Sequence, residues 1–135
     1  AIFLPGGHGT MFDYPGSADL TRLIEGFDRA GKLVSAVCHG PAGLVSAKTS
    51  TGAPLVEGRT VAAFTDSEEH AVGLQDTVPF LLETKLRELG AKISSAPDFQ
   101  VHAVRDGCLV TGQNPASAQK TAALVMQALS EKVAA

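Results

Sequence analysis

Hydrophobic residues occur along the chain in short runs that are typical of buried strands. The runs at residues 1–4, 33–37 and 61–64 are almost entirely apolar, and each leads into a segment rich in glycine or polar residues. This is the pattern of strands in a parallel sheet. Three further short strands are expected, at residues 92–94, 101–104 and 109–111.

Between the strands, apolar residues recur at helical spacing. Residues 18–30 form the first predicted helix, with Ser17 as its N-terminal cap and Gly31 just beyond its C-terminus. Three more helices are expected, at residues 42–47, 79–89 and 117–129.

The alternation of strands and helices predicts an α/β domain with a mostly parallel sheet and helices on both faces. At 135 residues the chain is the size of one domain. A glycine-rich turn at residues 5–9, Cys38, and the pair Glu68 and Glu69 each follow a predicted strand. Because parallel strands end at a shared edge where ligands bind, these residues are expected to lie near one another.

Composition and charge exclude several classes of function. The chain is 44% hydrophobic and 19% charged, with a net charge of −3, which is typical of a globular protein. Its 11 lysine and arginine residues are scattered, so no nucleic-acid partner is expected. No apolar run is long enough to span a membrane, and a cytoplasmic location is expected. The two cysteines lack the spacing of a zinc site, so neither a metal nor a disulfide is expected.

Cys38 stands between a predicted strand and a segment of small residues, which is the position of a nucleophile at a strand-to-helix turn. The sharp turn exposes the side chain. The N-terminus of the following helix is expected to lower the pKa of the thiol from about 8.5 toward or below 7. The alternative is a small core residue, since free cysteine is among the most buried residue types.

His39 is the candidate general base, because imidazole exchanges protons near neutral pH. A histidine in this role is usually oriented by a carboxylate on its far nitrogen. Asp66, Glu68 and Glu69 are the candidates, because they follow the next predicted strand. The alternative for the two glutamates is the acidic first turn of a helix capped by Ser67.

Small residues near Cys38 are candidates for oxyanion and substrate binding. Gly6 and Gly7 form either a plain turn or a site where backbone N–H groups approach a developing negative charge. Gly40 follows the Cys–His pair. The candidates to line a pocket at this turn are His8, Phe12 and Tyr14. The residues expected to be structural or on the surface are His70, His102 and Cys108.

Four motifs together resemble the ThiJ/PfpI (DJ-1) superfamily. They are Pro-Gly-Gly-His-Gly (5–9), Ala-Val-Cys-His-Gly-Pro (36–41), Phe-Thr-Asp-Ser-Glu-Glu (64–69) and Val-Thr-Gly-Gln-Asn-Pro-Ala-Ser-Ala (110–118). The likeness runs through the whole chain in order and is strongest to the heat-shock chaperone and glyoxalase III branch. It implies the flavodoxin-like, three-layer sandwich of the class I glutamine amidotransferase-like group.

The resemblance implies roles for individual residues. Cys38 would be the nucleophile, His39 the base and Glu69 the third member, with Glu68 as second choice. The amides of Gly7 and His39 would form the oxyanion site. The implied reaction turns methylglyoxal, a small 2-oxoaldehyde, into D-lactate through a hemithioacetal on Cys38, without glutathione, a metal or another cofactor.

Two other functions stay open. A holdase chaperone or protein deglycase of the stress response would use exposed apolar surface, with Cys38 as an oxidation sensor. An amidotransferase-like hydrolase or hydratase would use the same nucleophile. Glutaminases of this fold take their histidine and glutamate from the C-terminal region, and no histidine follows His102, which disfavours that activity.

The resemblance also bears on partners. Domains of this superfamily begin with strands that have no counterpart here, so residues 1–135 are expected to be the C-terminal part of a single domain. Without those strands, sheet edges and apolar surface would be exposed. The missing N-terminal segment or a partner chain is therefore expected to cover them, and a homodimer is expected from the resemblance.

Overall fold

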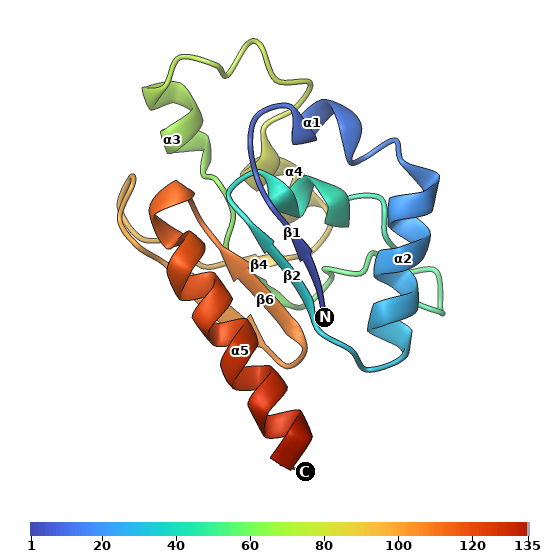
Figure 1. Cartoon of the computed structure of the whole chain (residues 1–135). Helices are drawn as coiled ribbons and strands as arrows, with labels where there is room; N and C mark the ends of the chain where they lie inside the picture. Colours follow the sequence, from blue (N-terminus) through green and yellow to red (C-terminus); the bar gives the residue numbers. More distant parts are fainter. Residues whose placement is uncertain (135) are drawn as a thin grey trace.

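The computed structural model describes residues 1–134. Three parallel strands form the centre of the fold. The sheet has the order β1-β2-β6-β5, and only β5 runs antiparallel to its neighbour. The predicted α/β architecture with a mostly parallel sheet is therefore confirmed (Figure 1). The bounds of these strands are β1 (Ile2–Leu4), β2 (Val34–Val37), β5 (Ala103–Asp106) and β6 (Leu109–Gly112).

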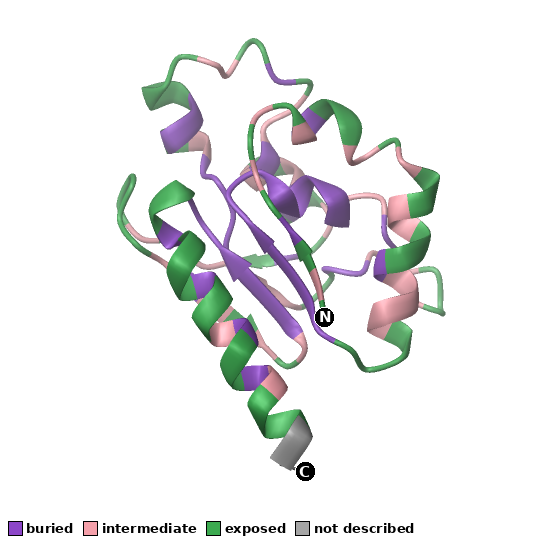
Figure 2. Cartoon of the chain, in the orientation of Figure 1, coloured by how far each residue is buried: buried purple, intermediate pink, exposed green. Residues whose placement is uncertain are grey.

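Helices pack on both faces of this sheet. α5 (Ala118–Ala134) runs along β6 on one face, and α2 (Ala18–Arg29) and the 3-10 helix η1 (Gly40–Leu44) lie on the other (Figure 1). Strands β2 and β6 are buried throughout (Figure 2). The core side chains on the α5 face are Leu33, Val110, Val125 and Ala128. Those on the other face include Ile24, Val34, Ala36, Leu44 and Leu109.

Short elements complete the fold at the edges of the sheet. The predicted caps of α2 are confirmed, because the Ser17 side chain accepts from the Leu20 amide and Gly31 has a φ of 70°. No helix within residues 1–134 is both long and apolar enough to cross a membrane. The remaining elements are α1 (Thr10–Asp13), β3 (Thr60–Val61), α3 (Asp66–Ala71), α4 (Leu82–Glu88), β4 (Lys92–Ile93) and η2 (Pro115–Ser117).

The strand predicted at residues 61–64 is only partly present. β3 ends at Val61 and pairs with β4 in a separate two-stranded parallel sheet. The next backbone groups bond elsewhere, since the Ala62 amide donates to Thr111 Oγ1 at 2.8 Å and the Phe64 amide donates to the Cys38 carbonyl at 3.0 Å. This segment therefore braces the ends of β2 and β6.

The helix predicted at residues 42–47 is wrong in type and position. The chain forms the 3-10 helix η1, which begins at Gly40 and ends at Leu44. Pro41 lacks an amide donor, and the glycines at positions 40 and 43 favour helix weakly. The unpredicted helix α1 is only one turn long, too short to produce a periodic pattern.

β1 is an outer strand of the four-stranded sheet, and its Phe3 is 38% exposed. An outer strand leaves backbone groups unpaired on one side. That a preceding segment or a partner chain covers this edge stays a prediction.

The close approach of η1 to β1 depends on Gly40. A Cβ atom there would overlap the carbonyl oxygen of Leu4 and lie 3.2 Å from that of Pro5. We expect Gly40→Ala to lower the free energy of unfolding by about 1–3 kcal/mol, because backbone atoms cannot move aside easily. Urea unfolding measures this change.

Gly26 provides the matched control, because a Cβ there meets nothing within 4 Å. Gly26→Ala is expected to stabilise α2 by about 0.5–1 kcal/mol through helix propensity. Equal stability of the two variants would contradict the role given to Gly40.

Candidate functional site

Cys38 lies at a strained turn directly after β2. Its φ is 63°, in the left-handed region that side chains other than glycine rarely adopt. Backbone hydrogen bonds hold this conformation on both sides. The Cys38 amide donates to the Gly112 carbonyl at 2.9 Å, and the Cys38 carbonyl accepts from the Phe64 amide. Strain of this kind costs on the order of 1–3 kcal/mol and is often found at functional sites. The turn is that of a nucleophile elbow.

Cys38, His39 and Glu69 lie in one connected series. The Cys38 Sγ is 3.4 Å from His39 Nδ1, and His39 Nε2 is 2.7 Å from Glu69 Oε2. His39 is 0% exposed, and Glu69 lies in the first turns of α3. The structure therefore brings together the three residues that the resemblance implied.

The hydrogen bonds fix the tautomer of His39. A carboxylate only accepts hydrogen bonds, so the proton on neutral His39 is on Nε2, where it is donated to Glu69. Nδ1 is then an acceptor that faces the Cys38 thiol. This arrangement allows the thiol proton to pass to His39.

His8 contacts the same carboxylate from the other side. Its Nε2 is 2.6 Å from Glu69 Oε1, and its ring centroid is 4.1 Å from that of His39. Phe64 closes this group, with its ring centroid 4.3 Å from His39. Phe64 ends the apolar run that precedes the acidic residues, but no role was predicted for it from the sequence.

The pKa of the Cys38 thiol is not lowered as expected. Burial raises the pKa of Cys38 to about 11, against the opposing effect of the backbone N–H groups of His39 and Gly7. The sequence expectation was wrong because the thiol is only 7% exposed and is followed by a five-residue 3-10 helix rather than an α-helix. The resting sulfur is therefore a neutral thiol.

Burial also lowers the pKa of His39 below its ordinary value, and the hydrogen bond that His39 donates to Glu69 opposes this shift. His8 adds to the lowering through charge repulsion. His39 is thus neutral at pH 7. A neutral thiol beside a neutral imidazole can transfer its proton when an electrophile arrives.

The glycine turn after β1 brings backbone donors to the sulfur. The backbone N–H groups of Gly7 and His39 act on the Cys38 thiol and oppose the rise of its pKa, and Gly7 has a φ of 112°. Thr10 ties the turn to the elbow, since its hydroxyl donates to the carbonyls of Gly7 at 2.8 Å and His39 at 3.1 Å. Thr10 was not predicted from the sequence, because a single hydroxyl at the start of a one-turn helix has no periodic pattern.

Gly6 and Gly40 contribute through close packing. A Cβ on Gly6 would lie 2.7 Å from the Val37 carbonyl oxygen and 2.8 Å from the Cys38 Cβ. Gly40 packs equally closely on β1. Both glycines therefore allow the turn after β1 and the elbow to touch.

Glu68 has a different environment from its neighbour Glu69. Thr65, and not Ser67, caps α3 in a capping box with Glu68. The fully buried Glu68 carboxylate also accepts from the Phe99 amide at 2.7 Å and from Asn114 Nδ2 at 2.9 Å. Glu68 therefore fastens the loop that contains Phe99 and does not bond His39.

Residues of the motif at 110–118 bind the same loop, which spans residues 96–100. Asn114 also donates to the Gln100 carbonyl at 2.7 Å, and the Gln113 side chain bonds both backbone groups of Ala96 at 2.9 and 3.1 Å. Phe99, with a φ of 60°, stacks edge-on against Phe64 at 6.1 Å. The loop thus reaches the aromatic group beside His39.

A pocket of about 320 Å³ opens beside Cys38. Its lining is mostly apolar and consists of Phe3, Pro5, Gly6, Gly7, Val37, Cys38, Pro115 and Ala118. His8, Phe12 and Tyr14, which were expected to line a pocket at this turn, are not among these residues. Phe12 is exposed, and the Tyr14 hydroxyl donates to the Pro5 carbonyl at 3.0 Å.

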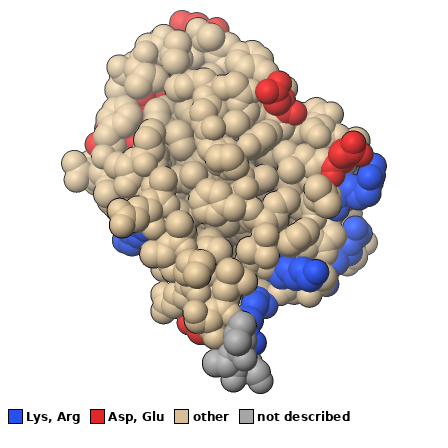
Figure 3. Space-filling model, viewed as in Figure 1, with Lys and Arg blue, Asp and Glu red and all other residues tan. Residues whose placement is uncertain are grey.

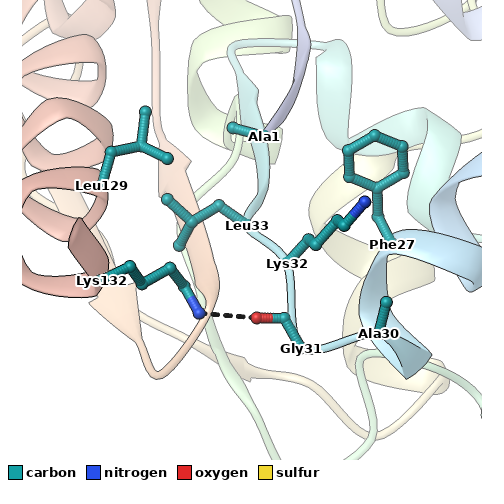
Figure 4. A pocket seen from close by; sticks show the side chains of 8 residues that line it. All are labelled: Ala1, Phe27, Ala30, Gly31, Lys32, Leu33, Leu129 and Lys132. Atoms are coloured by element: carbon teal, nitrogen blue, oxygen red, sulfur yellow. Dashed lines mark hydrogen bonds between the residues drawn. The ribbon is translucent and has the colours of Figure 1, made fainter. Parts of the chain in front are cut away.

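A second pocket, of about 640 Å³, lies near Ala1 between α2 and α5 (Figure 4). Its eight lining residues include no cysteine, histidine or carboxylate, and Lys132 bonds the Gly31 carbonyl there at 2.7 Å. On the face drawn in Figure 3, the lysine and arginine side chains lie mainly along the right-hand side and the lower part of the molecule. Of these two pockets, the one at Cys38 therefore combines space with a reactive group.

Within residues 1–134, one group of side chains has donor atoms close enough to hold a metal. The donor atoms of His8, His39 and Glu69 all lie within 4.8 Å of one another. Each carboxylate oxygen, however, already accepts a hydrogen bond from one imidazole. A metal would displace both protons and remove the orienting bond of His39.

The remaining candidates lie outside this site. His70 bonds the Asp66 carbonyl, His102 bonds Ser94 and Cys108 bonds the Gly31 carbonyl. These contacts agree with the expected structural or surface roles.

The chain is similar to proteins of one known family. The family model described as "DJ-1/PfpI family" matches residues 1–128. The chain is 39% identical over 136 residues to "Glutathione-independent glyoxalase HSP31" of Saccharomyces cerevisiae, covering 95% of this chain and 56% of that protein.

Two solved structures are also similar. The crystal structure of glyoxalase III from Candida albicans has a TM-score of 0.88 and 37% identity, covering 93% of this chain and 55% of that one. The Francisella tularensis Rapid Encystment Protein 24 KDa has a TM-score of 0.90 and 38% identity, covering 94% and 57%. The chain thus spans 55–57% of the length of these three proteins.

The raised pKa of Cys38 predicts slow alkylation. In a Cys108→Ser background, we expect the thiolate fraction of Cys38 at pH 7 to be about a hundredfold below that of an ordinary thiol. The rate with iodoacetamide should then rise about tenfold per pH unit between pH 7 and 9. A rate that levels off near or below pH 8 would show a lowered pKa instead.

The two adjacent glutamates should differ in their effect on stability. Glu68→Gln turns an amide group toward the donors of Phe99 and Asn114, and each donor left unpaired costs about 1–3 kcal/mol. Glu69→Gln is the matched control, because an imidazole can change tautomer to accept from the new amide. Urea unfolding should therefore show the larger loss for Glu68→Gln, and the reverse order would refute these roles.

Proposed function

The chain belongs to the DJ-1/PfpI family, and from this membership and the geometry at Cys38 we propose that it is a glutathione-independent glyoxalase. The substrate would be methylglyoxal or a related 2-oxoaldehyde, and the product D-lactate or its analogue. The observation that carries the proposal is the series from the Cys38 Sγ through His39 to Glu69, with spacings of 3.4 and 2.7 Å. Two similar proteins bear the name glyoxalase.

The first step uses the neutral pair. His39 Nδ1 accepts the thiol proton while the sulfur attacks the aldehyde carbon, and a C–S bond forms as the C=O double bond becomes a single bond. The amides of Gly7 and His39, which act on the sulfur, would donate to the developing oxyanion. Glu69 balances the positive charge of the imidazolium. Proton return to the oxygen gives the hemithioacetal.

Later steps rearrange protons within the substrate. His39 removes the proton from the former aldehyde carbon, and the neighbouring carbonyl oxygen takes up a proton, so that an enediol forms. A proton is then delivered to the neighbouring carbon while the hydroxyl on the sulfur-bearing carbon loses its proton, which leaves a thioester of the 2-hydroxy acid. Water hydrolyses the thioester and restores the thiol, so that the net reaction adds one water to methylglyoxal and needs no oxidant.

The shape of the site suits a small uncharged substrate. The pocket beside Cys38 is mostly apolar, and its polar groups near the sulfur are backbone amides. Neither a lysine nor an arginine is among its lining residues. A strongly anionic substrate would therefore find no charged partner there.

The proposal predicts D-lactate formation from methylglyoxal that depends on Cys38. Cys38→Ala should abolish turnover, and Glu69→Gln should lower kcat by about 10²–10⁴, the usual contribution of acid–base catalysis. The assay is enzymatic detection of D-lactate without glutathione, with the intact mass recorded in the same preparation.

Cys108→Ala is the matched control, because Cys108 bonds only the Gly31 carbonyl outside the site. It should keep wild-type turnover. Turnover that survives in Cys38→Ala would refute the mechanism. A folded, reduced protein without turnover would favour the holdase function, which Cys38→Ser should leave intact.

A further inference from the structure

The Glu69 carboxylate has two oxygens, and each one is bound by a different imidazole. Oε2 accepts from His39, and Oε1 accepts from His8 at 2.6 Å. A carboxylate that pairs with one histidine can still rotate about its last torsion angle, because terminal torsions of this kind are broad. Two opposed hydrogen bonds fix both oxygens, so the orientation of Glu69 depends on His8 as well as on His39.

His8 reaches Glu69 from a separate part of the chain. It lies in the glycine turn after β1, 61 residues from Glu69 in sequence. Its side chain is 35% exposed, whereas that of His39 is 0% exposed. The two rings lie 4.1 Å apart between centroids, and Phe64 contacts both. His8 is therefore the solvent-facing end of the group.

We propose that His8 is a positioning residue of the site. His8 holds Glu69 against His39 and shares the negative charge of the Glu69 carboxylate with His39. The expected effect of His8 on turnover rests on the proposed function. Its effect on His39 follows from the contacts alone.

The sharing of charge has a definite consequence for His39. The titratable groups that face His39 are Cys38, Glu69 and His8, with Glu68 behind Glu69. When the Glu69 carboxylate also accepts a hydrogen bond from His8, part of its negative charge is neutralised. It then stabilises an imidazolium at His39 less strongly than a carboxylate bound to His39 alone. His8 thus helps to keep His39 neutral and able to accept the thiol proton.

The test compares His8→Leu, which cannot donate, with His8→Gln, which keeps an amide donor on a shorter reach. The pKa of His39 is measured by NMR of the histidine ring, and kcat and KM for methylglyoxal are measured against pH. We expect His8→Leu to raise the pKa of His39 and to move the acid limb of kcat/KM to higher pH. It should also lower kcat by about tenfold with little change in KM.

His8→Gln should recover part of both effects. His70→Leu is the matched control, since His70 is an exposed histidine of α3 that bonds only the Asp66 carbonyl. It should leave the pKa of His39 and the acid limb unchanged.

A pKa of His39 that stays unchanged in His8→Leu would overturn the proposal, whatever happens to stability. If the wild-type protein shows no turnover, the proposed function fails, while the NMR measurement still decides the role of His8. A raised pKa in His8→Leu would then support the positioning role in a site of another function.

Discussion

The site depends on one constraint, the left-handed backbone of Cys38 at the end of β2. This conformation is unfavourable alone, and the surrounding segments maintain it. β6 accepts the Cys38 amide, the Phe64 amide binds its carbonyl, and Gly6 packs against its Cβ. Gly40 then lets η1 turn back onto β1. Each contact comes from a different part of the chain, so the elbow forms only when the sheet has formed.

Burial decides the charge state of the two reactive groups. Removing Cys38 and His39 from water disfavours the thiolate and the imidazolium alike. Both shifts favour the uncharged pair over the ion pair. The amides of Gly7 and His39 act in the opposite direction, but they stabilise the thiolate less than burial destabilises it. They would act most strongly on the negative charge that forms during attack, since no such charge exists in the resting thiol.

The sequence predicted the sheet, the caps of α2 and the set of residues around Cys38, because apolar runs and glycine turns are local patterns. It failed where long-range contacts decide. β3 is short because the Phe64 amide bonds Cys38, which no local pattern records. The pKa of Cys38 depends on how deeply the elbow is packed, and the strand-to-helix position alone suggested the opposite shift. His8 and Glu69 are 61 residues apart in the sequence, so their contact could not be predicted from the spacing of residues along the chain.

Glu68 and Glu69 show how adjacent identical residues come to differ. Both lie in the first turns of α3 and both are buried, so composition and propensity cannot separate them. Successive residues of a helix point about 100° apart, which turns Glu68 toward Asn114 and Glu69 toward His39. Glu68 binds donors whose protons are fixed on amides and a hydroxyl. Glu69 binds only imidazoles, whose protons can move. The mobility of the protons, rather than the carboxylate itself, therefore suits Glu69 for catalysis and Glu68 for structure.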